Sequence, residues 1–389
     1  MGPLAGYRAL DFGIAGTGPW TASLFGQLGA DVIKVEPPTG DITRFHNPKQ
    51  RGIGAAWIAM NANKRAIQLD LRSEQGLAAA RALARRADIL SNNFRPGTMD
   101  RLGLGYAAVA ETNPGLVYCQ ITGFGDEGPL ASRSCADFIM QAFSGFAAAN
   151  GPETERLEMY RFSGLLDLCT SITAVQATLA ALLERESSAL GQFVGVSMLE
   201  SALALLTPFA ARYWADGVVA RPSGSQSSLA APDAAFETAD DPVFVSVVTD
   251  TKWQAFCAAV ERADLAGDPR FTSAAARLAN KQALYSALAP TFRARRSRWW
   301  LVALRRANVP CGVAFDFERF RYHEQFVTQG LLTELDTETW GPVLLPGLPW
   351  IFERTPCQLQ APPVPGADTA QVLAELGPPV SAAAAEGEG

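Results

Sequence analysis

A single aspartate stands just ahead of a long apolar segment. The segment is RFSGLLDLCTSITAVQATLAALLERE, residues 161–186, and the acid is Asp167. An Asp here can accept hydrogen bonds from the free N–H groups of a helix's first turn, where its charge suits the positive helix end. A carboxylate held at a helix start and partly screened from water can also attack an activated carbonyl carbon. The segment alone favours the cap, which is the commonest use of Asp at such a place.

Few other side chains could do covalent or metal chemistry. Only two histidines, His46 and His323, are present, which nearly excludes histidine-based metal sites and Ser–His or Cys–His pairs. The six cysteines lie far apart without a CxxC pair. This is typical of reduced thiols in a cytosolic protein rather than of a disulfide framework or a zinc site. We therefore expect no metal, and the net charge of −6 argues against a nucleic-acid partner.

A glycine-rich turn joins a predicted strand to a predicted helix. The turn is DFGIAGTGP, residues 11–19, and the next strand ends in Glu36. This order is typical of a dinucleotide-binding βαβ unit, in which an acid contacts a ribose. However, the glycines do not form G-x-G-x-x-G, and Pro19 stands where the helix would offer amides to a pyrophosphate. The turn therefore gives weak support for NAD, although it would let another ligand approach the backbone.

Basic side chains cluster in three loops that follow predicted strands, at residues 34–44, 61–73 and 92–103. Ligands of open α/β sheets bind beyond the carboxyl ends of the strands, so these side chains could converge on a phosphate-bearing ligand. Any single one of them is better explained as a solvated loop charge. The residues are Arg44, Lys64, Arg65, Arg72, Arg95 and Arg101.

The elements that would position these residues alternate along the chain. Strands are predicted at 7–13, 31–36, 88–94 and 115–125, and helices at 19–30, 73–87 and 196–217. Such alternation predicts a parallel sheet covered on both faces, which is a doubly wound α/β domain.

The chain of 389 residues is long enough for two domains. We predict a large α/β domain at 1–200, a linker at 201–225 and a smaller α+β domain at 226–325, with a Ser-, Gly- and Pro-rich stretch at 221–233. We find no signal peptide and no apolar run of membrane-spanning length, so we expect a cytoplasmic protein without a membrane partner.

Six ordered segments resemble the family III CoA-transferases, the group that contains formyl-CoA transferase, carnitine CoA-transferase and alpha-methylacyl-CoA racemase. They are LGADVIKVEPPTGD, NANKRAIQLDLRSEQG, NNFRPGTMDRLGL, NPGLVYCQITGFGDEGP, DFIMQAFSG and LLDLCTSITAVQATLAALLERESSALGQFVGVSMLESAL. Two further segments, NVPCGVAFDFERF and GADTAQVLAELG, extend the resemblance over nearly the whole chain.

The resemblance implies a fold and a site. The large domain would be Rossmann-like and completed by residues 326–389, and two chains would form an interlocked homodimer. Asp167 matches the family's catalytic aspartate. Coenzyme A would be a co-substrate rather than a covalently bound cofactor. The positions implied for the CoA site are Ala15, Gly16, Thr17, Leu69, Arg72, Asn93, Phe94 and Arg101, and Asp137 falls on an active-site acidic position.

The implied reaction moves CoA from an acyl-CoA thioester to an acceptor carboxylic acid through aspartyl-acyl anhydride and aspartyl-CoA thioester intermediates. The alternative on the same fold is a 2-methylacyl-CoA racemase, but that branch has a histidine where this chain has Ala136. Racemisation needs an acid–base pair that straddles the α-carbon, so the transferase is favoured.

Three further features bear on specificity. Gly16 replaces the glutamine of formyl-CoA transferase, which argues against oxalate–formate specificity. The loop SGSQSS, residues 223–228, has the composition of a flexible lid. Arg161 or Tyr160 could hold a second carboxylate of a dicarboxylic acid, or Arg161 could simply be a surface residue.

Overall fold

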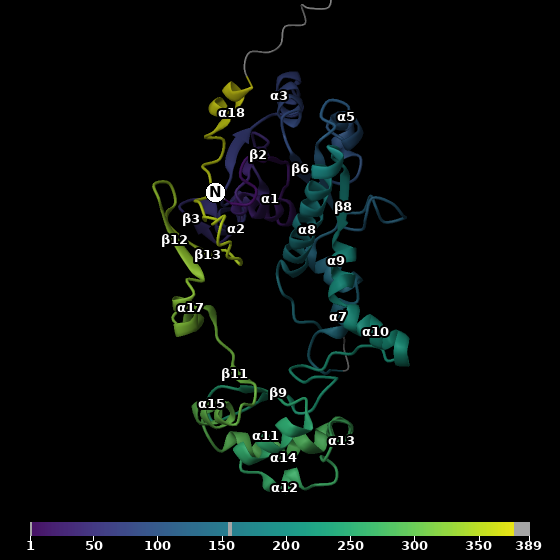
Figure 1. Ribbon diagram of the computed structural model, residues 1–389, viewed down its shortest axis with the longest axis vertical. Helices are drawn as coiled ribbons and strands as arrows, with labels where there is room; N and C mark the ends of the chain where they lie inside the picture. The colour runs from purple at the N-terminus through teal and green to yellow at the C-terminus, as the bar shows by residue number, and fades with distance from the viewer. Residues whose placement is uncertain (1, 155–157, 377–389) are drawn as a thin grey trace, which may run out of the picture. The chain divides into compact units, whose positions relative to one another are not determined.

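The computed structural model describes residues 2–154 and 158–376, and it divides into two compact units (Figure 1). The first unit contains Met1–Phe146, Arg161–Gly217 and Thr328–Gly389. The second contains Ala147–Tyr160 and Val218–Val327. Residues 377–389 of the predicted return segment lie outside the described part of the chain.

A six-stranded sheet in the order β5-β2-β1-β6-β7-β8 forms the centre of the first unit. Its strands are β1 (Arg8–Asp11), β2 (Asp31–Glu36), β5 (Arg65–Gln68), β6 (Ile89–Asn92), β7 (Val117–Thr122) and β8 (Phe193–Ser197). Every neighbouring pair is parallel, and β1 lies between β2 and β6, with Ala9 opposite both Val32 and Ile89. The predicted parallel sheet in a mixed α/β fold is confirmed.

The first unit also contains helices and two hairpins. Its helices are α1 (Thr17–Gln27), α2 (Ala55–Met60), α3 (Glu74–Ala84), α4 (Thr98–Arg101), α5 (Tyr106–Ala110), α6 (Asp137–Phe143), α8 (Leu165–Ser188), α9 (Met198–Leu205), α10 (Thr207–Asp216) and α18 (Thr369–Glu375), with the 3-10 helix η1 (Ile42–Phe45). Two hairpins join β3 (Lys49–Gln50) to β4 (Ile53–Gly54), and β12 (Leu332–Thr337) to β13 (Gly341–Pro346).

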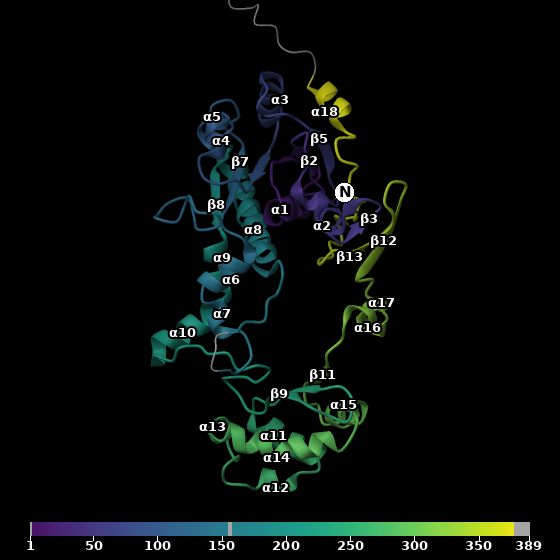
Figure 2. The ribbon, with the colours of Figure 1, turned by 180° about the vertical axis from the view of Figure 1, so that it is seen from behind.

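Side chains alternate between the two faces of the sheet, as strand geometry requires. Leu10 and Ile33 pack in one buried cluster with residues of α3 and α18. Ala9 and Val32 pack in another with residues of α1 and α8. Helices thus cover both faces, and α1 and α8 lie side by side on one of them (Figure 2).

Helix α8 has 24 residues and contains an 18-residue window with a mean hydropathy of 1.5, so by length and composition alone it could cross a membrane. The helix is nevertheless not an uninterrupted apolar run, because polar residues such as Asp167 and Gln176 lie within it. The physical reason for its apolar character lies in the fold: α8 packs against α1, β7 and β8, and Val175 and Leu182 are buried there.

Residues 201–217 differ from the linker that the sequence predicts. They form most of α9 and all of α10 in the first unit. The break between these two helices falls at Leu206, just before Pro208, whose missing N–H suits the first turn of a new helix.

The second unit has an antiparallel sheet in the order β11-β10-β9. Its elements are β9 (Asp233–Phe236), β10 (Val243–Ser246), β11 (Cys311–Val313), α11 (Asp250–Ala259), α12 (Ala263–Ala266), α13 (Ala274–Ala279), α14 (Lys281–Arg293), α15 (Ser297–Arg306), α16 (Phe317–Phe320) and α17 (Glu324–Thr328); α7 (Phe146–Ala149) stands at a boundary between units. Aromatic side chains fill its core, where the rings of Phe236 and Phe292 stack with centroids 4.4 Å apart.

Candidate active site

A cavity of about 490 Å³ lies at the carboxyl ends of the parallel strands in the first unit. The turn after β1, the loop after β6, the end of β7 and the first turn of α8 all contribute to its walls. Its lining residues are Ile14, Ala15, Gly16, Thr17, Asn93, Phe94, Arg95, Pro96, Thr98, Ile121, Thr122, Gly123, Ala131, Arg133, Ser134, Cys135, Ala136, Asp137, Asp167 and Met198. This is the edge at which open α/β sheets bind ligands.

A larger cavity of about 790 Å³ contains none of the residues that the family resemblance assigns to the site. It is lined by residues such as Arg8, Asp31 and Arg65, near the amino ends of the strands. These charges already pair with one another, because Arg8 and Arg65 both contact Asp31, at 2.9 and 2.7 Å.

Asp167 is not the cap of α8. The helix follows Gly164, whose φ of 79° is left-handed, and Asp137 on α6 supplies the capping carboxylate. Asp137 Oδ1 accepts hydrogen bonds from the backbone N–H of Leu166 at 2.7 Å and of Asp167 at 3.2 Å, and its Oδ2 accepts one from Gly164 N–H at 3.3 Å. The capping interpretation of Asp167 is therefore wrong, because an acid on another helix performs that role.

The Asp167 side chain lies in the wall of the cavity, where the Thr17 hydroxyl donates to its Oδ1 at 2.6 Å. Thr17 begins α1, and Asp167 is in the first turn of α8. Two helix N-termini, each with N–H groups that have no acceptor within the helix, thus meet at one carboxylate. Their partial positive charges favour a negative charge at this point.

Burial is the largest influence on the acidity of Asp167, and it raises the pKa of this carboxyl above its usual value. The hydrogen bond from Thr17 acts in the opposite direction, and the nearby charge of Asp137 adds to the rise. A carboxylate with a raised pKa is more basic, and hence a better nucleophile, in the pH range where it is ionised. The arrangement therefore suits covalent attack by Asp167.

Sequence and structural comparisons agree on one family. Residues 4–369 match CoA-transferase family III. An acetyl-CoA:oxalate CoA-transferase of Acetobacter aceti is 33% identical over 349 residues, which cover 90% of this chain and 88% of the relative. The chain belongs to CoA-transferase family III.

Other members of the family are similar over the same extent. A succinate–glutarate CoA-transferase of Agrobacterium fabrum is 32% identical, with 96% of each chain covered. The crystal structure of a CAIB/BAIF family protein from Brucella suis superimposes with a TM-score of 0.86 at 30% identity, covering 96% of this chain and 99% of the other.

Most of the residues that the family resemblance assigns to the site lie together. The cavity brings together Ala15, Gly16, Thr17, Asn93, Phe94, Asp137 and Asp167. Asn93 also fixes the turn after β1, because its side-chain amide accepts from Ile14 N–H and donates to Ile14 O, both at 2.8 Å.

Three predicted residues do not line this cavity. Leu69 is buried in the core beside the sheet. Arg72 is exposed and pairs with Asp70 at 3.0 Å, and Arg101 donates to Thr98 Oγ1 at 3.2 Å. A contact of these three with CoA remains a prediction.

The predicted convergence of basic loop residues on a phosphate is wrong for three of them. Arg44 pairs with Glu36, Lys64 with Asp11, and Arg65 with Asp31 and Glu375. Of the six basic residues, Arg95 is the one that lines the cavity. Sequence position cannot reveal such pairing, because the acids come from other segments of the chain.

Several lining residues were not predicted. Arg133, Ser134 and Cys135 come from the segment before α6, and Met198 follows β8. The sequence signal that could have indicated Arg133, Ser134 and Cys135 is their place shortly before the family segment DFIMQAFSG.

Replacing Asp137 with alanine is expected to lower the free energy of unfolding by about 2 kcal/mol, because three backbone N–H groups at the start of α8 lose their acceptor. Chemical denaturation measures this change. The matched control is Glu74→Ala, an acid in the first turn of α3, where Ser73 already caps the helix. Equal small losses in both variants would contradict the capping role of Asp137.

Proposed function

We propose that this chain transfers CoA from an acyl-CoA thioester to an acceptor carboxylic acid, with Asp167 as the nucleophile. The single observation that carries the proposal is the placement of the Asp167 carboxylate, relieved of capping by Asp137 and lying in a cavity between two helix N-termini. Membership of CoA-transferase family III supports the reaction class.

The reaction needs no general base, since each step exchanges one carboxylate for another. Asp167 attacks the thioester carbonyl carbon, the C–S bond breaks, and CoA leaves as a thiolate. The thiolate then attacks the aspartyl carbonyl of the mixed anhydride, which releases the donor acid and leaves an aspartyl-CoA thioester. An acceptor carboxylate reverses these steps, so the new acyl-CoA forms and Asp167 is again ionised.

Backbone amides at the start of α1 are suited to stabilise the oxyanion of each tetrahedral intermediate, because they are fixed before reaction. Thr17 holds the attacking carboxylate in one orientation. Lining residues such as Asn93, Phe94 and Arg95 are placed to contact the CoA portion of the donor.

We propose a short dicarboxylic acid as donor or acceptor. The relatives are named for oxalate, glutarate, malate and mesaconate, all of which carry two carboxyl groups. Arg161, one candidate for the second carboxylate, is exposed and lies over the Phe138 ring at 4.6 Å.

A screen of acyl-CoA donors against mono- and dicarboxylic acids, read by mass spectrometry of the CoA products, tests this proposal. We expect new acyl-CoA to accumulate only when both a donor and an acceptor acid are present. Hydrolysis alone, or no product with any pair, would contradict it. The racemase alternative predicts loss of α-deuterium from a 2-methylacyl-CoA without an acceptor acid; Ala136 and the lack of histidine among the cavity-lining residues argue against it.

We further propose a doubly wound large domain, an interlocked homodimer and a cytoplasmic location. Apolar side chains that a partner could cover support the dimer: on α9 and α10, Leu203 is 55% and Trp214 is 78% exposed. Light scattering measures the mass in solution, and a monomer at micromolar concentration would contradict this assembly.

Replacing Thr17 with valine is expected to move the acid limb of kcat/KM to higher pH. The Thr17 hydrogen bond lowers the pKa of Asp167, so its loss raises that pKa and leaves less ionised nucleophile at a given acidic pH. Rate measurements across the acid range check this shift. Thr21→Val is the control, because the Thr21 hydroxyl donates to Thr17 O and not to Asp167. If the acid limb of kcat/KM lay at the same pH in both variants, the role of Thr17 would be refuted.

A further inference from the structure

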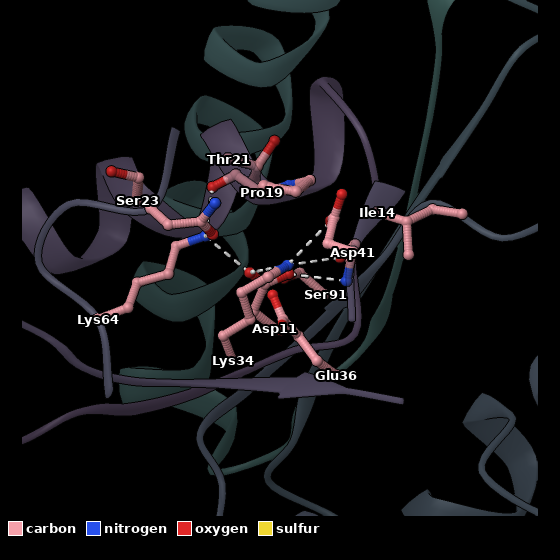
Figure 3. Close-up of polar contacts among 12 residues, drawn as sticks. Asp11, Ile14, Pro19, Thr21, Ser23, Lys34, Glu36, Asp41, Lys64 and Ser91 are labelled. Carbon is pink, nitrogen blue, oxygen red and sulfur yellow. Dashed lines mark hydrogen bonds and ion pairs between the residues drawn. The ribbon is translucent and has the colours of Figure 1, made fainter. Parts of the chain in front are cut away.

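Four charged side chains form a cluster (Figure 3), and hydrogen bonds join it to the turn at residues 13–19. The side chains of these residues are fully buried, with 0% exposure; they are Asp11, Lys34, Asp41 and Lys64. Lys64 Nζ lies 2.7 Å from Asp11 Oδ2, and Lys34 Nζ lies 3.8 Å from Asp11 Oδ2 and 3.4 Å from Asp41 Oδ2. With two positive and two negative groups, the cluster is neutral.

Each member of the cluster also forms one hydrogen bond with the backbone of the turn. Asp11 Oδ1 accepts from Gly13 N–H at 2.7 Å, and Lys34 Nζ donates to Gly13 O at 2.9 Å. Asp41 Oδ2 accepts from Ala15 N–H at 3.2 Å. Lys64 Nζ donates to Pro19 O at 2.7 Å. The turn is therefore held at four backbone atoms between residues 13 and 19.

Stability alone does not account for such a cluster. Removing charges from water costs more than their mutual attraction returns unless the geometry is good, and well-packed apolar residues often stabilise a core equally well. What the charges add is directional: they fix particular N–H and C=O groups in place. The fixed turn includes Ala15, whose φ of 62° is left-handed, which a residue other than glycine adopts at an energetic cost.

The next two residues touch the nucleophile. Thr17 donates to Asp167, and a Cβ built on Gly16 would lie 2.7 Å from Asp167 Oδ2. A small rotation of the turn at Ala15 would therefore change both contacts. Misplacement by about 1 Å is enough to slow an enzymatic step by about a hundredfold.

We propose that Asp11, Lys34, Asp41 and Lys64 are positioning residues, which hold the turn at Ala15 so that Gly16 and Thr17 orient the Asp167 carboxylate. This inference rests on the proposed function, because it assigns the cluster a role in the same reaction. Asp41 acts on the turn next to the residues that contact Asp167, since it accepts a hydrogen bond from the N–H of Ala15, which precedes Gly16.

The substitution Asp41→Asn tests whether the hydrogen bonds of Asp41 position the turn, because it keeps the side chain's size. Asp41 Oδ1 accepts from Thr43 N–H at 2.8 Å and from Thr43 Oγ1 at 2.7 Å, while Oδ2 faces Ala15 N–H and Lys34. An asparagine side chain of the same shape has only one acceptor oxygen, so it places an N–H₂ donor against other donors on one side or the other. Thr43→Val is the matched control, because it removes one donor on the Oδ1 side and leaves the Ala15 contact intact.

The test is a double-mutant cycle of Asp41→Asn with Thr17→Val, measured as kcat with an active donor–acceptor pair. We expect Asp41→Asn to lower kcat about tenfold to a hundredfold, and the double variant to be no slower than the slower single variant by more than about twofold. Thr43→Val should stay within about threefold of the natural protein. Independent effects that multiply in the double variant would overturn the inference, as would a loss in Thr43→Val as large as that in Asp41→Asn.

The pH profile of kcat/KM gives a second readout. Loss of the Asp41 charge and loss of the Thr17 contact shift its acid limb in opposite directions. Removing the negative charge of Asp41 would by itself move the acid limb to lower pH, because it favours ionisation of Asp167. Losing the Thr17 contact moves the limb to higher pH. The other titratable groups that face Asp167 are Asp137 and Cys135, and neither is altered. An upward shift in Asp41→Asn supports positioning, and a downward shift contradicts it.

If Asp41→Asn does not fold, the variant Lys34→Met with Asp41→Asn restores a neutral cluster and enters the same cycle. Covalent labelling of the natural protein by an acyl-CoA distinguishes a failure of the positioning role from a failure of the proposed function. A labelled Asp167 with multiplicative effects would reject the positioning role alone. An unlabelled Asp167 during turnover would reject the proposed function, and the inference with it.

Discussion

Replacing Asp167 with asparagine is expected to lower the rate of CoA transfer by at least about a thousandfold. The asparagine amide occupies the same space and can still accept from Thr17, so the cavity keeps its shape. It cannot ionise, however, and so cannot form the anhydride. Steady-state transfer between an active donor and acceptor measures the loss, and circular dichroism checks that the fold is retained.

Asp126→Asn is the matched control for this experiment. Burial raises the pKa of Asp126 as it does that of Asp167, yet Asp126 pairs with Gln120 at 2.6 Å and does not line the cavity. We expect its rate within about threefold of the natural protein. An Asp167→Asn variant that kept one tenth of the CoA-transfer activity would show that the nucleophile is another group.

Replacing Gly16 with alanine is expected to lower kcat by about a hundredfold, with little change in the melting temperature. A Cβ at this position would lie 2.7 Å from Asp167 Oδ2, which is closer than real Cβ atoms approach other groups, and 3.0 Å from its Cγ, which is tight. The carboxylate must therefore move, and with it the path of attack on the thioester. Valine at position 16 should be slower still.

The control for Gly16→Ala is Gly115→Ala, where a Cβ would meet its nearest neighbours at 3.9 Å, an ordinary van der Waals distance. Equal rates for the two alanine variants would mean that Asp167 has room to adjust and that Gly16 is unimportant to the chemistry. Titration with CoA separates a loss of binding from a loss of turnover.

Local patterns predicted the sheet well. β2 matches the predicted strand 31–36 in full, because its β-branched residues are buried on both faces. Helix α3 falls within the predicted helix 73–87, and Ser73 caps it by accepting a hydrogen bond from Gly76 N–H at 3.1 Å. In contrast, β5 and β8 were not predicted; β8 is short and partly exposed, and it runs into an apolar segment without a turn signal.

The site could be predicted only in part, because some of its contacts join segments that are distant in sequence. Family resemblance located Ala15, Gly16, Thr17 and Asp167, which the structure brings to one cavity. It did not reveal that Asp137 caps α8, since the two partners lie about 30 residues apart and meet only in the fold. Pairing of buried charges likewise depends on tertiary structure, which no spacing in the sequence encodes.

The most direct test of covalent catalysis is the mass of the protein after mixing with an acyl-CoA donor and no acceptor acid. We expect an aspartyl-CoA thioester, which hydroxylamine converts to a hydroxamate on the peptide that contains Asp167. The label should be lost in Asp167→Asn. Transfer activity with an unmodified Asp167, or with the label on a different peptide, would contradict it.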